Sequence, residues 1–206
     1  MSLYELPPLG YTYDALEPHL DRKTVEIHYD QLFRQDASRL EWAVKKRPEF
    51  FKGKTIEEVL RDTSAIPRDI LKMILDYGGS FVNHSLYFQG MSPNGGGNPM
   101  GRMARDINTQ FGGFESLKRS FAVQAQSIFE PGWIWLVVNQ DKKLDIVKTT
   151  LQANPVSLGL EPLMGIDLWE HAYWLSYPNQ LEAYLKGFWE IVNWDIIEEK
   201  YEQMMK

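Results

Sequence analysis

The segment DLWEHAYW, residues 167–174, concentrates chemically active side chains: it holds two carboxylates, one imidazole and three large aromatic rings. Asp167 and His171 are four positions apart, so they share one face of a continuous helix, and they can also converge from a strand and a helix that meet at a corner. Either arrangement can bind a metal ion. The structural alternative is that Asp167 caps a helix and His171 packs in the core with its hydrogen bonds satisfied.

The histidines of the chain suggest which metal chemistry is available. Four are present, at His19, His28, His84 and His171, and we interpret His19 as a core residue. His28, His84 and His171, taken with Asp167, form an oxygen and nitrogen ligand set that suits Mn, Fe or Zn. Because the chain has no cysteine, thiolate zinc sites, iron–sulfur clusters, disulfides and cysteine nucleophiles are excluded.

The composition restricts the class of protein. With 206 residues, of which 44% are hydrophobic and 13% aromatic, the chain can bury a substantial core in one large or two small domains. The net charge of -6 argues against general nucleic-acid binding, which needs a cationic surface. No apolar run approaches the roughly 20 residues of a membrane span, and the N-terminus lacks a signal-peptide pattern. We therefore expect a soluble, cytoplasmic protein with no nucleic-acid or membrane partner.

Helical spacing dominates the first half of the chain. Apolar residues recur at steps of three and four through residues 24–47, and a second stripe of this kind runs through residues 70–88. A short helix is expected between them, at residues 55–62. Gly78 and Gly79 predict a kink or close packing inside the second long helix. We expect the two long helices to form an antiparallel hairpin.

The segment MSPNGGGNPMG, residues 91–101, is the strongest change of composition in the chain, with four Gly, two Pro and two Asn. We place a boundary here between two domains, residues 1–92 and residues 93–206. A phosphate-binding role for the glycine run is disfavoured, because no strand precedes it and no Gly-Lys-Ser/Thr ending comes after it.

The second half mixes helices with strands. GWIWLVVN, residues 132–139, contains no alternating polar positions and predicts a strand buried on both faces, whereas residues 144–151 alternate as in a half-buried antiparallel strand. The other expected elements are a helix at 114–128, a third strand within 162–169, an amphipathic helix at 181–192 and a solvated helix end at 198–206. The predicted fold class is α+β: an N-terminal helical hairpin followed by an α/β domain with a three-stranded antiparallel sheet.

The sequence resembles the iron/manganese superoxide dismutase family over nearly its whole length. DLWEHAYW is similar to the family's Asp-x-Trp-Glu-His-Ala-Tyr signature, and FVNHSLYF, residues 81–88, to its Asn-His-x-x-Phe/Tyr-Trp segment. The opening LPPLGYTYDALEPHLDRKTVEIHYD, residues 6–30, and the segments PGWIWLVV and VNWD also have family counterparts. The order and spacing of these segments make chance a poor explanation.

The resemblance implies a function and a metal site. The function is the disproportionation of superoxide to O2 and H2O2, with His28, His84, Asp167 and His171 holding one ion per chain, manganese or alternatively iron, and with water or hydroxide as a further ligand. Three neutral imidazoles and one carboxylate contribute one negative charge. A site with a trivalent ion and hydroxide then carries the same net charge as one with a divalent ion and water. One-electron oxidation and reduction of the metal, coupled to a proton, therefore avoid a change of charge in a dry site.

The resemblance also implies a glutamine that hydrogen-bonds this solvent ligand. Iron-type members carry it four residues before the second ligand histidine, where this chain has Ser80. Manganese-type members carry it after the second strand, where this chain has Gln152. We therefore expect a manganese-type arrangement with Gln152 as a catalytic residue, although Ala153 replaces the usual aspartate. The alternative is that Gln152 is an exposed turn residue.

Glu170 is similar to the family residue that reaches across a dimer to a ligand histidine. The resemblance thus implies a homodimer, in which Glu170 pairs with His171 of the partner subunit. Trp133, Trp169 and Tyr173 are expected to line the pocket or keep it dry.

The chain departs from the family pattern around this pocket. Leu32 replaces a pocket histidine, Asp36 a gate tyrosine, Phe88 a common tryptophan and Leu181 a cation at the funnel rim. These changes affect proton delivery and anion steering, not metal binding. They leave an alternative open: a metal-binding protein of this fold with weak or no dismutase activity, which has a structural or binding role or acts on another redox substrate.

Overall fold

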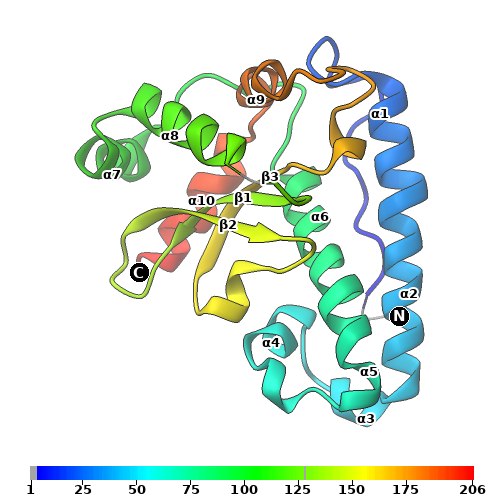
Figure 1. Cartoon of the computed structure of the whole chain (residues 1–206). Coiled ribbons are helices and arrows are strands. Elements are labelled where there is room, and N and C mark those ends of the chain that lie inside the picture. Colours follow the sequence, from blue (N-terminus) through cyan, green and yellow to red (C-terminus); the bar gives the residue numbers. More distant parts are fainter. Residues whose placement is uncertain (1–3, 128) are drawn as a thin grey trace.

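The computed structural model describes residues 4–127 and 129–206. Figure 1 shows a pair of long helical columns beside a small sheet that carries its own helices. The predicted α+β class, with a helical hairpin and a three-stranded antiparallel sheet, is confirmed. Ile128, the last position of a predicted helical stripe, lies outside the described residues.

The first column of the hairpin is a continuous rod of three segments: α1 (Arg22–Glu26), η1 (Ile27–Phe33) and α2 (Arg34–Lys46). The Asp21 carboxylate caps its start by accepting a hydrogen bond from the Thr24 backbone N–H at 2.9 Å. The middle segment η1 is a π-helical turn, a local widening that recurs at functional sites. His28 lies in this turn.

The second column runs through α5 (Arg68–Met73), the π-helical turn η3 (Ile74–Gly78) and α6 (Gly79–Gln89). The expected irregularity at Gly78 and Gly79 is therefore a π-helical turn combined with close packing: a Cβ on Gly79 would lie 2.0 Å from the backbone oxygen of Gln152. The short elements that join the two columns are α3 (Pro48–Phe51), α4 (Ile56–Arg61) and a 3-10 turn, Thr63–Ala65.

The second half supplies the sheet and its covering helices. Its elements are α7 (Gly101–Phe111), α8 (Phe114–Gln126), β1 (Gly132–Val138), β2 (Leu144–Thr150), β3 (Glu161–Asp167), α9 (Leu181–Trp189), α10 (Trp194–Met204) and two 3-10 turns, η4 (Pro155–Leu158) and η5 (Glu170–Ala172). The helix α7 was not predicted, because only Met103 and Ile107 of its side chains are fully buried and the apolar stripe is thin.

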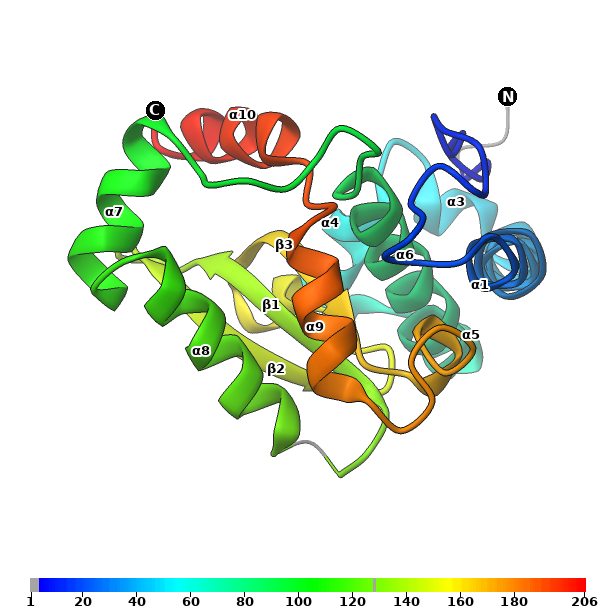
Figure 2. The same ribbon diagram turned by 90° about the horizontal axis from the view of Figure 1, so that it is seen from above.

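The sheet has the strand order β2-β1-β3, and both pairings are antiparallel. The central strand β1 is buried along its whole length and β2 alternates between buried and more exposed positions, as predicted. Seen from above, α8 and α9 lie across the sheet (Figure 2), and the hairpin helix α6 packs against β3. The register sets Trp133 opposite Asp167, the last residue of β3.

One hydrophobic core joins the hairpin to the sheet. It includes Phe33 and Tyr87 from the helical columns and Trp133 and Phe188 from the second half, all at most 1% exposed. The helix end expected to be solvated also contributes: the Tyr201 ring is fully buried and its hydroxyl donates to Asp106 Oδ2 at 2.6 Å. The expectation was wrong only for Tyr201, which continues the buried stripe of Trp194 and Ile197 at helical steps, whereas Glu199, Glu202 and Gln203 are exposed.

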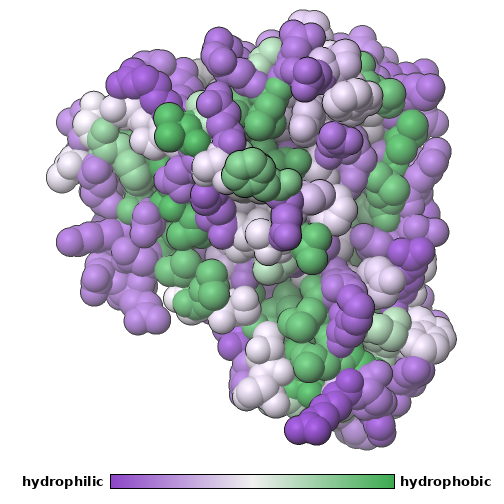
Figure 3. Space-filling model, viewed as in Figure 1, coloured by the Kyte–Doolittle hydropathy of each residue, from purple (hydrophilic) through white to green (hydrophobic). Residues whose placement is uncertain are grey.

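The surface is hydrophilic over most of the face drawn in Figure 3, with hydrophobic groups toward its middle and over the lower helical part. No helix among the described residues is long and apolar enough to cross a membrane.

Candidate metal centre

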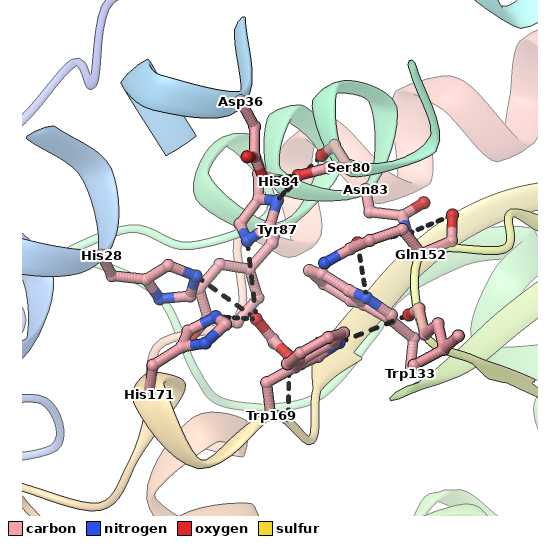
Figure 4. A network of polar contacts seen from close by, with 12 residues as sticks. His28, Asp36, Ser80, Asn83, His84, Tyr87, Trp133, Gln152, Trp169 and His171 are labelled. Carbon is pink, nitrogen blue, oxygen red and sulfur yellow. Dashed lines mark hydrogen bonds and ion pairs between the residues drawn. The ribbon is translucent and has the colours of Figure 1, made fainter. Parts of the chain in front are cut away.

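Four side chains from both halves of the chain converge on one point. They are His28 on η1, His84 on α6, Asp167 at the end of β3 and His171 in η5. The Nε2 atoms of His28, His84 and His171 lie 3.3, 3.7 and 3.3 Å from Asp167 Oδ2. All four atoms lie within 4.8 Å of one another, and Figure 4 shows the rings of His28, His84 and His171 turned toward a common centre.

The chemistry of this cluster fits a metal ion. All four atoms, the three Nε2 atoms and Asp167 Oδ2, are buried. None of them has a hydrogen-bond partner within residues 4–127 and 129–206. Buried polar atoms without partners are destabilising, so the arrangement needs a cation to be satisfied. Two ligand atoms each about 2.1 Å from one ion are about 3.0–3.6 Å apart at ordinary coordination angles. The two 3.3 Å distances from Asp167 Oδ2 lie within that range, and the distance to His84 Nε2, 3.7 Å, lies just above it.

Hydrogen bonds on the outer side of the cluster orient two of its members. His84 Nδ1 lies 2.8 Å from the backbone oxygen of Ser80, so Nδ1 carries the proton and Nε2 presents its lone pair to the centre. Asp167 Oδ1 accepts from the Trp169 backbone N–H at 2.9 Å, which leaves Oδ2 facing the imidazoles. Both groups are thus held in the form that binds a cation.

Burial controls the protonation of the cluster. It lowers the pKa of His28 to about 4 and, with the repulsion of His28, the pKa of His84 to about 3. For Asp167, burial acts to raise the pKa, but the attraction of the adjacent His171 and His28 outweighs burial and holds the pKa well below its usual range. At neutral pH His28 and His84 are neutral imidazoles and Asp167 is a carboxylate, and these are the ligand forms that metals require.

Aromatic rings enclose the cluster on its inner sides. Phe88 lies 5.0 Å from the His28 ring, Trp133 lies 5.2 Å from the His84 ring, and Trp169 stacks on His171 at 5.7 Å. Tyr173 instead stacks on Tyr184 at 4.9 Å and lines a neighbouring depression. The two tryptophans therefore lie at the cluster as expected, whereas Tyr173 lines the depression that also contains Glu170 and His171.

Gln152 is anchored beside the cluster by a network that the sequence did not reveal. Its Oε1 accepts from Asn83 Nδ2 and from Trp133 Nε1, both at 3.2 Å. Asn154 Nδ2 in turn donates to Asn83 Oδ1 at 2.7 Å. Because Oε1 is already occupied, the NH2 group of Gln152 is the part that remains free to donate. Asn83 is adjacent to His84 in the motif, but its partners lie about 70 positions away, so spacing gave no signal for them.

A pocket of about 420 Å³ connects the cluster to the surface. Its lining residues are Leu32, Gln35, Asp36, Arg39, Lys72, Asp76, Tyr77, His84, Leu151, Gln152, Trp169 and His171. Leu32 and Asp36 thus line the approach, as their spacing from His28 predicted. Leu181 does not: it lines the depression that also contains Glu170.

The charged groups of the pocket are paired with one another. Asp36 Oδ2 accepts from Ser80 Oγ at 2.7 Å and Oδ1 lies 3.5 Å from an Arg39 guanidinium nitrogen. Lys72 Nζ lies 2.7 Å from Asp76 Oδ2. Burial raises the pKa of Asp36, although Ser80 and Arg39 act to lower it. The pocket therefore presents two cations and two acids in adjacent pairs.

Comparisons with known proteins show what this chain is similar to. Residues 3–92 match the alpha-hairpin domain model of iron/manganese superoxide dismutases, and residues 99–200 match their C-terminal domain model. A superoxide dismutase of the Mn type from Listeria monocytogenes is 42% identical over 97% of this chain and 98% of its own length. One from Thermus aquaticus is 41% identical over 96% of this chain and 97% of its own length. With two matching domain models and full-length similarity, this chain belongs to the iron/manganese superoxide dismutase family.

Proposed function

We propose that this chain is a superoxide dismutase that converts superoxide to O2 and H2O2 at one manganese ion per chain, with iron as the alternative metal. The observation that carries the proposal is the set of four converging, buried and unpartnered ligand atoms of His28, His84, Asp167 and His171. Relatives named as manganese superoxide dismutases, 41–42% identical over nearly the full length, support the choice of metal.

In this proposal the chain's residues hold the ion and control its surroundings. A bound manganese ion supplies the one-electron oxidation and reduction that superoxide disproportionation requires. The carboxylate of Asp167 gives the cluster one negative charge, and the neutral imidazoles add none, which limits the net charge that the dry site must hold. Phe88, Trp133 and Trp169 exclude water from the inner sides.

Gln152 is the catalytic residue we assign beside the ligands. Its side-chain oxygen is held by Asn83 and Trp133, so its NH2 group can donate to a solvent molecule in the pocket. Such a bond orients the solvent that delivers protons and adjusts its acidity. Ser80, at the position of the iron-type glutamine, has no amide to offer. The manganese-type arrangement is therefore the one we propose.

Metal content and turnover measured on the same preparation test the proposal. We expect about one manganese per chain by elemental analysis, superoxide turnover with manganese, and the loss of both in His84→Ala. Asp145→Asn, an exposed change on β2, serves as the control. A full complement of metal without turnover would instead support the alternative, a metal-binding protein of this fold, which the similarity to dismutases over the full length does not favour.

We also propose a homodimer in which Glu170 pairs with the partner subunit's His171. The Glu170 carboxylate is exposed, the His171 side chain is 26% exposed, and both line a depression of about 500 Å³ next to the fully exposed ring of Phe129. A second subunit would cover these groups. Light scattering should give twice the chain mass for the wild type and a lower mass for Glu170→Ala. Glu49→Ala is the control, because the Glu49 side chain is 87% exposed, and it should keep the mass of the wild type.

Two further expectations stand as proposals. The division into residues 1–92 and 93–206 is supported by the limits of the two family models, and limited proteolysis within residues 93–98 would test it. The cytoplasmic location and an antioxidant role remain predictions, which cell fractionation and growth of a deletion strain under superoxide stress would test.

A further inference from the structure

Two hydrogen bonds connect the mouth of the pocket to a ligand of the proposed metal ion. Ser80 Oγ donates to Asp36 Oδ2 at 2.7 Å and lies 3.0 Å from His84 Nδ1 (Figure 4). Ser80 is fully buried and the Asp36 side chain is 21% exposed. The two residues come from different helices, α2 and α6, so folding alone brings them together.

The direction of these bonds depends on which groups can donate. An ionised carboxylate only accepts, so the Ser80 hydroxyl proton points to Asp36. The same hydroxyl oxygen can then only accept from His84, whose Nδ1 proton is shared with the Ser80 backbone oxygen at 2.8 Å. Asp36 thereby polarises the imidazole through Ser80 and favours a fully available lone pair on Nε2.

We propose that Asp36 and Ser80 are a positioning pair for His84, an inference that rests on the proposed function of the four-ligand cluster. Asp36 orients the Ser80 hydroxyl, Ser80 holds and polarises His84, and the carboxylate adds a fixed negative charge beside the ion. This charge favours the more oxidised form of the metal. Asp36 stands in place of the family's gate tyrosine and Ser80 in place of the iron-type glutamine. Because the two side chains contact one another, they act as one unit.

The experiment compares Asp36→Ala, Ser80→Ala, the double variant and Asp36→Asn with the wild type. Manganese affinity is measured by competition with a chelator. We expect each alanine variant to bind manganese about tenfold more weakly, within the range typical for the outer partners of ligands, and the double variant to lose less than the product of the two single effects.

Asp76→Ala is the matched control, because Asp76 is a second carboxylate of the same pocket and pairs with Lys72 rather than with Ser80. It should leave manganese affinity within about twofold of the wild type, since its charge is already paired with Lys72 at the surface. Circular dichroism of the metal-free proteins checks their folding.

The midpoint potential of the bound metal is a readout that a purely structural role would not move. Asp36→Asn keeps the shape of the side chain and an acceptor for Ser80 but removes the charge, so we expect a higher midpoint potential than in the wild type. Because this residue is partly exposed, the variant should fold even if Ser80→Ala does not.

Independent effects of the two alanine changes, or an Asp36→Asn potential equal to that of the wild type, would overturn the inference. Wild-type protein that binds no manganese would overturn both the inference and the proposed function. Wild-type binding with unchanged affinity in the variants would overturn the inference alone.

Discussion

The ligand cluster, which is buried, and the mouth of the pocket, which is partly exposed, arrange their polar groups in opposite ways. In the cluster, four buried atoms face one another and none of them has a hydrogen-bond partner among the described residues. At the mouth, Asp36 is paired with Ser80 and Arg39, and Asp76 with Lys72. Converging ligand atoms without hydrogen-bond partners indicate a site that a cation completes. The charged groups at the mouth, which are paired with one another, already satisfy each other.

The cluster and the mouth also differ in how closely they match the family pattern. The cluster keeps the ligand types that the family motif requires, while the mouth has Leu32 and Asp36 in place of the usual residues. We therefore expect metal binding and access to the metal to depend on separate residues of this chain. Four predictions test how far this independence extends.

The largest effect is expected from Asp167→Asn, which removes the charge on which the three imidazoles converge. Manganese at a hundredfold excess over its dissociation constant should stabilise the wild type by about 2.7 kcal/mol, or about 5–10 °C in Tm. The variant should show no stabilisation by manganese, whereas Asp145→Asn should retain it. Calorimetry with and without manganese is the measurement, and equal stabilisation of both variants would refute our assignment of the ligand.

The metal-free protein should lose stability in acid because of the cluster. The folded pKa values of His28 and His84 lie near 4 and 3, below the unfolded value of about 6.5. The unfolded chain therefore binds more protons below pH 6.5, and stability falls as the pH drops from about 6.5 to 4, by on the order of 3 kcal/mol for each histidine. Asp167, with its lowered pKa, adds a further loss below about pH 4.

Urea unfolding of the metal-free protein from pH 7 to 4 checks this second prediction. His84→Leu should reduce the slope of the free energy of unfolding against pH to about half in this range, because one of the two buried histidines is absent. A free energy of unfolding that is constant between pH 6.5 and 4.5 would contradict our account of the burial of the cluster.

Gly79→Ala tests whether the packing of α6 against the Gln152 turn matters to the site. The new Cβ would lie 2.0 Å from the Gln152 backbone oxygen, so the turn must move, at a cost of about 1–3 kcal/mol. Gly78→Ala is the matched control, since its nearest contact is the flexible end of Ile56 at 2.9 Å. We expect lower turnover and a lower Tm for Gly79→Ala only, measured by assay and thermal melting. Similar losses in both variants would show that helix geometry, not the turn, is responsible.

The smallest effect is expected at the mouth. Asp76→Asn leaves Lys72 unpaired and should raise superoxide turnover by about twofold to tenfold at low ionic strength through stronger attraction of the anion. Lys72→Gln should lower turnover. Both differences should vanish as salt increases, because a Debye length of about 8 Å at 0.15 M screens exposed charges. Rates that do not depend on ionic strength would exclude steering by this pair.

The order of the elements could be predicted because their signals are local. The buried run of β1 and the alternation of β2 each depend on residues within one strand, and both were confirmed. Helix α7 and the burial of Tyr201 were not predicted, because each depends on a few buried side chains in a polar segment. At the pocket, spacing correctly predicted that Leu32 and Asp36 line the approach, and it gave no warning that Leu181 lies elsewhere.

The sequence by itself determined the chemical types at the centre: three imidazoles, one carboxylate, no thiolate, and a glutamine after the second strand. Only the tertiary structure decided that Asp36 bonds to Ser80 and that Gln152 is fixed by Asn83 and Trp133. The reason is physical. Residue type and short-range periodicity are properties of neighbouring positions, whereas contacts between α2, α6 and the sheet arise from packing that no local pattern encodes.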